Sequence, residues 1–263
     1  MAKVILDEYQ KRVKISVSSI NVSSVQQIRA RVNTTLTSGV QIDLSTEESK
    51  KFLRRHVNSK TKIVIMFTDI NDSTEMSFSL PDEKFAALIR TIAQETSITV
   101  SGHGGYVFKY EGDAVISLFP AEYNPISACK NTLDCSRAVL EIVRNIINPA
   151  FKTNGLPEIT VRTGLAYGDA LVVLYGKNLE TAHIDIIGSS ISVAAKIVST
   201  AKANQILVGE QFYNILLSPA AGEDFMYYKS ILNEVSLDRE KWKYLSRSNT
   251  GGIYRVYEYL ETY

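Results

Sequence analysis

The sequence predicts an α+β fold, in which a sheet that contains antiparallel strands carries helices on one face. Three observations lead to this prediction. Residues 63–67 form a continuous apolar run typical of a buried strand. Two short strand-like runs separated only by residues 111–113 indicate a tight hairpin. Signals for strand, helix, hairpin, helix and strand then follow one another in the order of a ferredoxin-like core.

Apolar residues at helical spacing mark the helices. The first helix is expected to begin at Pro81, with acids in its first turn, and to end near Gly102. A second helix is expected over residues 125–147 and a third over residues 189–201. A short helix is expected over residues 210–217.

Strand signals fill the intervals between these helices. The hairpin strands are expected at residues 106–110 and 114–119. Two further strands are predicted at residues 159–165 and 169–173, joined by a turn at Tyr167 and Gly168. Residues 205–208 and the aromatic segment 252–260 complete the pattern.

The first part of the chain differs in character from the rest. It is rich in Ser and Val, with helix-like stretches at residues 6–15 and 25–36. We therefore divide the chain into an N-terminal helical extension, residues 1–60, and a main domain, residues 61–263. The extension could pack on the main domain or mediate assembly, and both alternatives stay open.

Composition excludes several classes of protein. The chain has 263 residues, of which 45% are hydrophobic, so a sizeable core can form. A net charge of +1 gives no electrostatic case for nucleic acid or an anionic membrane as partner. The start resembles no signal peptide, and no apolar run is long enough to span a bilayer. Cys129 and Cys135 match no metal or redox spacing and are expected to face the core, as in a cytoplasmic protein.

Two acidic residues form the strongest local feature. Asp69 ends the first core strand, and Asp113 lies at the tip of the hairpin. In a ferredoxin-like sheet these places are neighbours, so both carboxylates can converge on one point, with the carbonyl of Ile70 as an extra oxygen ligand. Such ligands suit Mg²⁺ or Mn²⁺. The competing interpretation is that each acid is only a turn or cap residue.

Three segments add a family resemblance. They are Phe67-Thr68-Asp69-Ile70 with Ser73-Thr74, Lys109-Tyr110-Glu111-Gly112-Asp113-Ala114, and Asp185-Ile186-Ile187-Gly188 with the helix from Ile191 to Lys196. In their joint spacing, residues 62–217 resemble the class III nucleotidyl cyclases, the adenylate/guanylate cyclase family. The resemblance implies a class III cyclase catalytic domain that closes a nucleoside triphosphate into a cyclic monophosphate.

The resemblance also implies roles for single residues. Asp69 and Asp113 would hold two divalent metal ions, Mn²⁺ or Mg²⁺. Lys109 and Asp185 would read the base. The active sites would lie at the subunit interface of a homodimer. The remaining substrate contacts would come from Phe67, Asn71, Ser73 and Thr74.

Two departures from the family pattern lie on one helix. Ser192 stands where the family usually has Asn to orient the ribose, and Lys196 where it usually has Arg against the transition-state phosphate. They are four residues apart and so share a face. Lys keeps the positive charge and loses the bidentate fork. A solvated helix lysine is the competing interpretation. A further phosphate-binding cation is expected near the C-terminal strands, where we favour Arg247.

The identity of the base is predicted from two resemblances. Lys109 and Asp185 match the pair that reads adenine in adenylate cyclases. The altered Ser192 and Lys196, together with the stretch that ends at Ala203-Asn204-Gln205, resemble the pyrimidine cyclases of bacterial Pycsar anti-phage systems, which make cyclic UMP or cyclic CMP. We predict a pyrimidine cyclase, with an adenylate cyclase as the alternative.

Two other classes compete with this prediction. One is an inactive pseudo-cyclase, which the departures at Ser192 and Lys196 favour and the retained acids oppose. The other is a polymerase-palm or diguanylate-cyclase-like enzyme. That class needs a Gly-Gly-acid-acid hairpin, which Glu111-Gly112-Asp113 does not supply.

Overall fold

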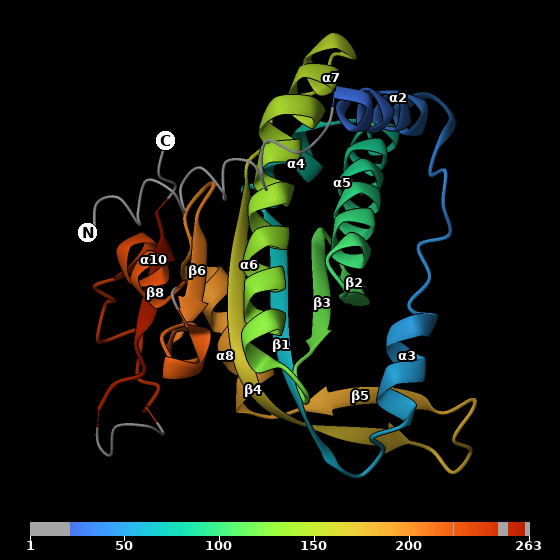
Figure 1. Ribbon diagram of the computed structural model, residues 1–263. Helices are drawn as coiled ribbons and strands as arrows, with labels where there is room; N and C mark the ends of the chain where they lie inside the picture. Colours follow the sequence, from blue (N-terminus) through green and yellow to red (C-terminus); the bar gives the residue numbers. More distant parts are fainter. Residues whose placement is uncertain (1–21, 223, 247–251, 261–263) are drawn as a thin grey trace.

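The computed structural model describes residues 22–222, 224–246 and 252–260. Its centre is an eight-stranded mixed sheet in the order β2-β3-β1-β4-β6-β8-β7, with β5 paired to β4 outside this path (Figure 1). The predicted α+β class is confirmed. The strands are β1 (Lys60–Ile70), β2 (Tyr106–Glu111), β3 (Ala114–Pro120), β4 (Val161–Tyr175), β5 (His183–Ile187), β6 (Ile206–Gly209), β7 (Leu232–Glu234) and β8 (Val256–Tyr259).

Strand β1 lies at the middle of the sheet because its apolar residues are buried on both faces. It pairs antiparallel with β3 on one side and with β4 on the other. The register places Thr68 beside Val115 and Asp69 beside Arg162. The acidic end of β1 therefore lies next to the turn of the β2–β3 hairpin.

Two helical layers cover the sheet. The helices α5 (Asp82–Gly102) and α6 (Pro125–Ile142) lie on one face, over a core that includes Val64 and Met66 of β1. The helix α8 (Ser189–Thr200) packs on the other face with Ile63 and Ile65 (Figure 1). The helices of the ferredoxin-like core thus share one face, as predicted, and α8 adds a second layer.

Residues 159–173 differ from the prediction. Instead of two strands with a turn at Tyr167 and Gly168, residues 161–173 belong to one continuous strand, β4. Tyr167 pairs with Val64 in the ladder to β1. A Cβ on Gly168 would lie 3.2 Å from the Cβ of Ser190 in α8. The glycine lets α8 approach β4 closely. In the sequence, such a glycine cannot be told apart from a turn glycine.

Residues 125–147 are helical as predicted, and the helical segment continues to Thr153. Helix α6 stops at Ile142, a π-helical turn, η1, covers Val143–Ile147, and α7 (Asn148–Thr153) follows. The sequence also gave no signal for α3 (Glu47–Arg54) or for α10 (Asp224–Ile231). The short helix expected at residues 210–217 is α9 (Glu210–Leu216).

Cys129 and Cys135 are both buried, as predicted. Burial raises the pKa of each thiol, so both stay protonated and unreactive, and both side chains serve as small apolar residues of the core. No helix among the described residues combines the length and apolar character that crossing a bilayer requires.

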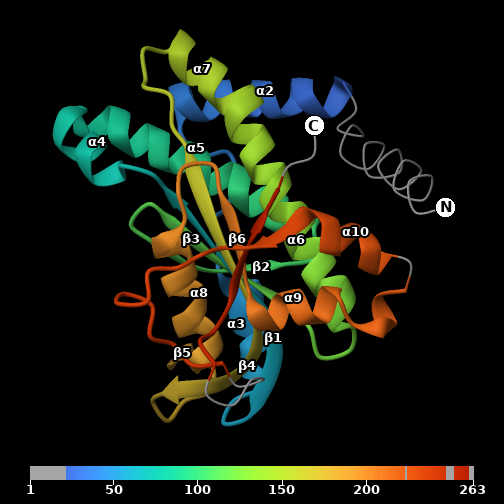
Figure 2. The same ribbon diagram turned by 90° about the vertical axis from the view of Figure 1, so that its left-hand side faces the viewer.

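The described part of the N-terminal extension, from residue 22 onwards, packs on the main domain. Its helix α2 (Val22–Ser38) corresponds to the stretch predicted at residues 25–36, whereas residues 6–15 lie outside the described part of the chain. Figures 1 and 2 both place α2 beside α7 and α5, which it contacts. Arg31 donates from Nε and Nη2 to the two carboxylate oxygens of Glu95 on α5, at 2.8 and 2.6 Å. This pair fixes α2 on α5.

Removing this pair should destabilise the fold. Glu95 has a 2% exposed side chain, so Arg31→Ala leaves a buried carboxylate without its charged partner. We expect a loss of about 2–3 kcal/mol in the free energy of unfolding, measured by urea titration. As a control, Lys51→Ala removes only an exposed pair with Glu48 and should leave the unfolding midpoint unchanged. An unchanged midpoint for Arg31→Ala would show that α2 is dispensable.

Candidate active site

The two predicted acids converge at the end of β1. Asp113 lies in the turn between β2 and β3, where Gly112 supplies a left-handed backbone with φ of 64°. From there the Oδ2 atom of Asp113 accepts the backbone N–H of Ile70 at 3.3 Å. Burial raises the pKa of Asp69, and the neighbouring charge of Asp113 raises it further. Two carboxylates that influence each other in this way form a site that favours a cation between them.

Arg162 completes this site, and sequence reasoning missed it. It lies opposite Asp69 in the β1–β4 ladder. Its Nε and Nη2 atoms both donate to Oδ2 of Asp69, at 2.9 and 2.6 Å, and this opposes the rise in the pKa of Asp69. Its role follows from its position opposite Asp69, on the strand that pairs with β1. That position is known from the strand register and cannot be read from the sequence alone.

The arrangement leaves one oxygen of each carboxylate available. Arg162 holds Oδ2 of Asp69 and the Ile70 N–H holds Oδ2 of Asp113, while no N–H or O–H group of the described residues is bonded to either Oδ1. In addition, Oδ1 of Asn71 is shielded from solvent without a hydrogen-bond partner. Carboxylate and amide oxygens of this kind are hard donors.

Such a donor set fits a divalent ion that brings other ligands with it. Among the described residues, no cluster of three or more His, Cys, Asp or Glu side chains could hold a metal alone. Mg²⁺ and Mn²⁺ commonly bind through one or two carboxylates and complete their shells with water and substrate phosphates. Asp69 and Asp113, with the carbonyl of Ile70, could hold such an ion.

The loop after β1 leads into a cavity beside these acids. Asp72 adopts a left-handed conformation, with φ of 57°, and α4 (Ser73–Ser79) begins directly after it. A cavity of about 470 Å³ lies here. Its lining includes Ser73, Thr74, Arg90, Gly112 and Asp113. The structure therefore brings Ser73 and Thr74 to the same cavity as one of the acids.

The predicted base-reading residues form an ion pair. Nζ of Lys109 on β2 lies 2.6 Å from Oδ2 of Asp185 on β5. The register of β2 shifts between Val107 and Lys109, and such a bulge can re-aim a side chain. Oδ1 of Asp185 accepts the N–H of Ile186 at 2.8 Å. The sequence placed Asp185 in a loop, and β5 was missed because this strand is short.

Ser192 and Lys196 lie on the exposed side of α8. The hydroxyl of Ser192 donates to the carbonyl of Gly188 at 3.2 Å. Among the described residues Lys196 has no ion-pair partner, and neither side chain touches the acidic pair within this chain. Phe67 is buried with 8% exposure among the residues that pack on α8. Arg247 lies outside the described residues.

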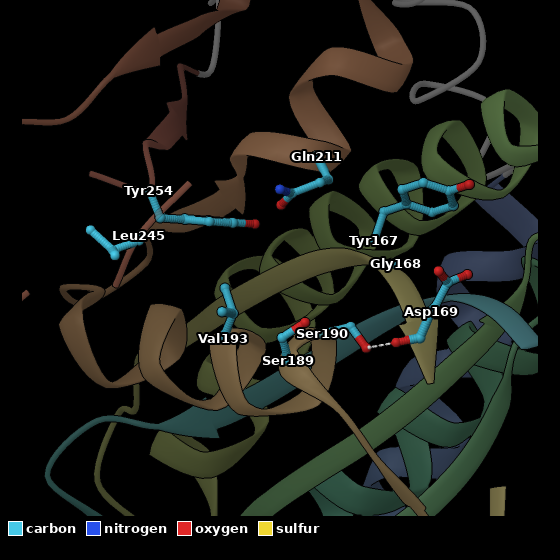
Figure 3. Close-up of a pocket in the computed structure, with 9 residues that line it drawn as sticks. All are labelled: Tyr167, Gly168, Asp169, Ser189, Ser190, Val193, Gln211, Leu245 and Tyr254. Carbon is cyan, nitrogen blue, oxygen red and sulfur yellow. Dashed lines mark hydrogen bonds between the residues drawn. The ribbon is translucent and has the colours of Figure 1, made fainter. Parts of the chain in front are cut away.

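A second cavity, of about 330 Å³, lies where α8 begins. Figure 3 shows the Ser190 hydroxyl, which donates to the carbonyl of Asp169 at 2.9 Å, with Gln211 and Tyr254 on the opposite side (Figure 3). None of the predicted metal-binding or base-reading residues lines this cavity. The site at Asp69 and the site at Asp185 are therefore separate from it.

Comparison with known proteins gives the class. The family described as the adenylate and guanylate cyclase catalytic domain matches residues 56–243. The chain belongs to this family, as the resemblance predicted. It is 28% identical to "Adenylate cyclase 1" of Rhizobium meliloti over 138 residues, which are 52% of this chain and 20% of that protein. It is 23% identical to "Cytidylate cyclase" of Escherichia coli over 202 residues, which are 74% of this chain and 43% of that protein.

A "Uridylate cyclase" of Rhodovulum sp. is 26% identical over 141 residues, which are 50% of this chain and 55% of that protein. The chain thus spans between 20% and 55% of the length of these relatives. Solved structures agree in fold. The adenylyl cyclase CyaB from P. aeruginosa has a TM-score of 0.63 at 18% identity, over 78% of this chain and 96% of that chain. The guanylyl cyclase Cya2 has a TM-score of 0.61 at 16% identity, over 77% and 93%.

Charge removal at the acidic pair gives a test of the metal assignment. Asp113→Asn keeps an oxygen for the Ile70 N–H and removes the like charge beside Asp69. We expect the metal-free variant to melt at the same temperature as the wild type or higher, because strained functional charges cost stability. Mn²⁺ should raise the melting temperature of the wild type and not of the variant. A retained Mn²⁺-dependent shift in the variant would exclude Asp113 as a ligand.

Proposed function

We propose that this chain is a nucleotidyl cyclase, which closes a nucleoside triphosphate into a 3′,5′-cyclic monophosphate and releases pyrophosphate. The observation that carries the proposal is the convergence of Asp69 and Asp113 beside the cavity that Ser73 and Thr74 line. Membership of the cyclase family supports it.

In this reaction the 3′ oxygen of the ribose attacks the α-phosphorus, the bond to the β-phosphate breaks, and the hydroxyl proton is lost to water. When bound, two divalent ions, Mn²⁺ or Mg²⁺, supply positive charge to the attacking and leaving oxygens. Asp69, Asp113 and the carbonyl of Ile70 would hold them. Arg162 keeps a fixed guanidinium next to the same point, where triphosphate oxygens need positive charge.

The base is proposed to bind at Lys109 and Asp185, which place a donor and an acceptor side by side. Cytosine matches them with its ring N3 acceptor beside a 4-amino donor, and adenine matches them with N1 beside its 6-amino group. Uracil offers the reverse order, a carbonyl oxygen beside a ring N–H. We therefore propose a pyrimidine cyclase that prefers CTP to UTP, with ATP as the alternative substrate.

We further propose that the chain acts as a homodimer, with Ser192 and Lys196 supplied by the partner subunit. Both side chains are exposed and neither touches the acidic pair in its own chain. An exposed helix face that carries an unpaired ammonium suits an electrostatic role across an interface. Arg247 remains the proposed further phosphate contact.

The proposed product is a second messenger of a cytoplasmic anti-phage response. Its support is the resemblance to Pycsar cyclases and the pyrimidine cyclases among the relatives. Cells that carry the wild type should accumulate the cyclic nucleotide on phage infection, and cells that carry Asp69→Ala should not. Equal protection by both would separate defence from catalysis.

The activity is tested by incubating the purified protein with Mn²⁺ and each of the four nucleoside triphosphates. We expect cyclic CMP as the main product, identified by mass spectrometry. Asp69→Ala and Asp113→Ala should each abolish turnover without unfolding the protein. No cyclic product from any substrate would favour the pseudo-cyclase, and activity retained in either variant would overturn the metal assignment.

The shared site is tested by mixing two inactive variants. If sites are built from both chains, Asp69→Ala mixed with Lys196→Ala regenerates one intact site in each heterodimer. We expect partial recovery of activity, with Asp69→Ala mixed with Asp113→Ala as the matched control that recovers none. Equal activity in the two mixtures would favour a site within one chain.

The charge of Lys196 is tested by two substitutions at that position. Lys196→Ala should lower turnover about a hundredfold, the usual effect of removing one group that stabilises transition-state charge. Lys196→Arg keeps the charge and can form bidentate hydrogen bonds to phosphate, so its turnover should equal or exceed that of the wild type. Equal turnover in all three proteins would show that Lys196 takes no part.

A further inference from the structure

The short helix α3 (Glu47–Arg54) lies just before the family-matched segment, which begins at residue 56. It nevertheless contacts both β2 and β5. Figure 1 shows it directly against β5 (Figure 1). These are the strands that carry Lys109 and Asp185, so α3 touches both strands on which the proposed base-reading pair lies.

These two strands belong to the same sheet, but they are not hydrogen-bonded to each other. β2 is hydrogen-bonded to β3, and β5 is hydrogen-bonded to β4. The separation of Lys109 from Asp185 is therefore not set by a common ladder. Within the sheet β2 and β5 are linked only through β3, β1 and β4, so an element that contacts both strands directly can set the spacing that gives the 2.6 Å ion pair.

Three side chains of α3 supply that connection. Leu53 is fully buried in the cluster that contains Phe108 of β2 and Ile184 of β5. The ring of Phe52 stacks on Tyr106, at the start of β2, with 5.9 Å between centroids. Arg54 reaches the loop before β5.

The contact of Arg54 is directed at backbone. Its Nε donates to the carbonyl of Leu179 at 3.1 Å and its Nη2 to the carbonyl of Glu180 at 2.6 Å. Glu47 lies 3.8 Å from Nη1 and steadies the guanidinium. Charged donors on two successive carbonyls fix the loop from which β5 starts.

We infer that α3 is a positioning element for the base-reading pair, and that Arg54 is a positioning residue for base selectivity. This inference rests on the proposed function of Lys109 and Asp185. A small shift of β5 changes where Asp185 meets the base, and the selectivity among nucleotides then changes with little effect on the chemistry at Asp69.

The test compares the wild type with Arg54→Ala, Arg54→Lys and Lys51→Ala, using kcat/KM for CTP, UTP, ATP and GTP. Arg54→Ala should lower the ratio of the best to the worst substrate about three- to tenfold, mainly through KM. The ammonium group of Arg54→Lys can bind one of the two carbonyls, so its selectivity ratio should lie between those of the wild type and Arg54→Ala. Lys51→Ala, on the same helix with an exposed pair, should match the wild type.

A double mutant separates positioning from general stability. In a Lys109→Ala background the base-reading pair no longer exists, so adding Arg54→Ala should not change the selectivity ratio further. The inference is overturned if Arg54→Ala leaves the selectivity ratio unaltered, or if it lowers the ratio equally in the wild-type and Lys109→Ala proteins. In either case α3 would contribute only to the stability of the fold.

The failure of the proposed function can be told apart from this outcome. If the wild type makes no cyclic product, the same variants are compared by competition of the four nucleoside triphosphates with a fluorescent nucleotide. A preference that Arg54→Ala reduces upholds the inference without catalysis. Equal competition curves for wild type and Arg54→Ala overturn it.

Discussion

Two carboxylates held close together in a half-buried site are the constraint on which the rest of this structure depends. Left free, Asp69 and Asp113 would move apart, because burial and like charge both disfavour two ionised acids. Rigid backbone prevents this: Asp69 ends a strand buried on both faces, and Asp113 sits in a hairpin tied to Ile70. The central sheet thus stores an electrostatic cost that a bound cation can relieve.

The same constraint explains the position of Arg162. Without a metal, the guanidinium is the cation that offsets the pair, and it uses only Oδ2 of Asp69. A cation site with its free oxygens already aligned needs little reorganisation when ligands arrive. Because Arg162 is opposite Asp69 in the ladder, one register between β1 and β4 fixes both the acid and its partner.

The sequence could predict those parts of the site that are coded locally. An apolar strand that ends in Asp69 and a three-residue turn that contains Asp113 are readable because strand and hairpin signals are short-range. Arg162 could not be found, since its role follows from strand register. Gly168 was wrongly assigned to a turn. It lies where Ser190 of α8 packs against β4, and the sequence alone does not distinguish such a glycine from a turn glycine. The N-terminal helix α3 was missed because its apolar side is short and its partners lie far along the chain.

The two proposed halves of the substrate site differ in how firmly the single chain holds them. The acidic pair belongs to adjoining strands of one sheet, so the chain alone aligns it. Lys109 and Asp185 come from strands that share no ladder, and they depend on an ion pair and on α3. Among the described residues, Ser192 and Lys196 form no hydrogen bond or ion pair with the side chains of either group. Rigidity therefore decreases from the metal-binding acids to the base-reading pair and then to the α8 residues. It follows that the spacing of the proposed base-reading pair is the part of the site most open to change by substitution, because it rests on contacts outside the strand ladders, whereas the proposed metal-binding acids are fixed by adjoining strands.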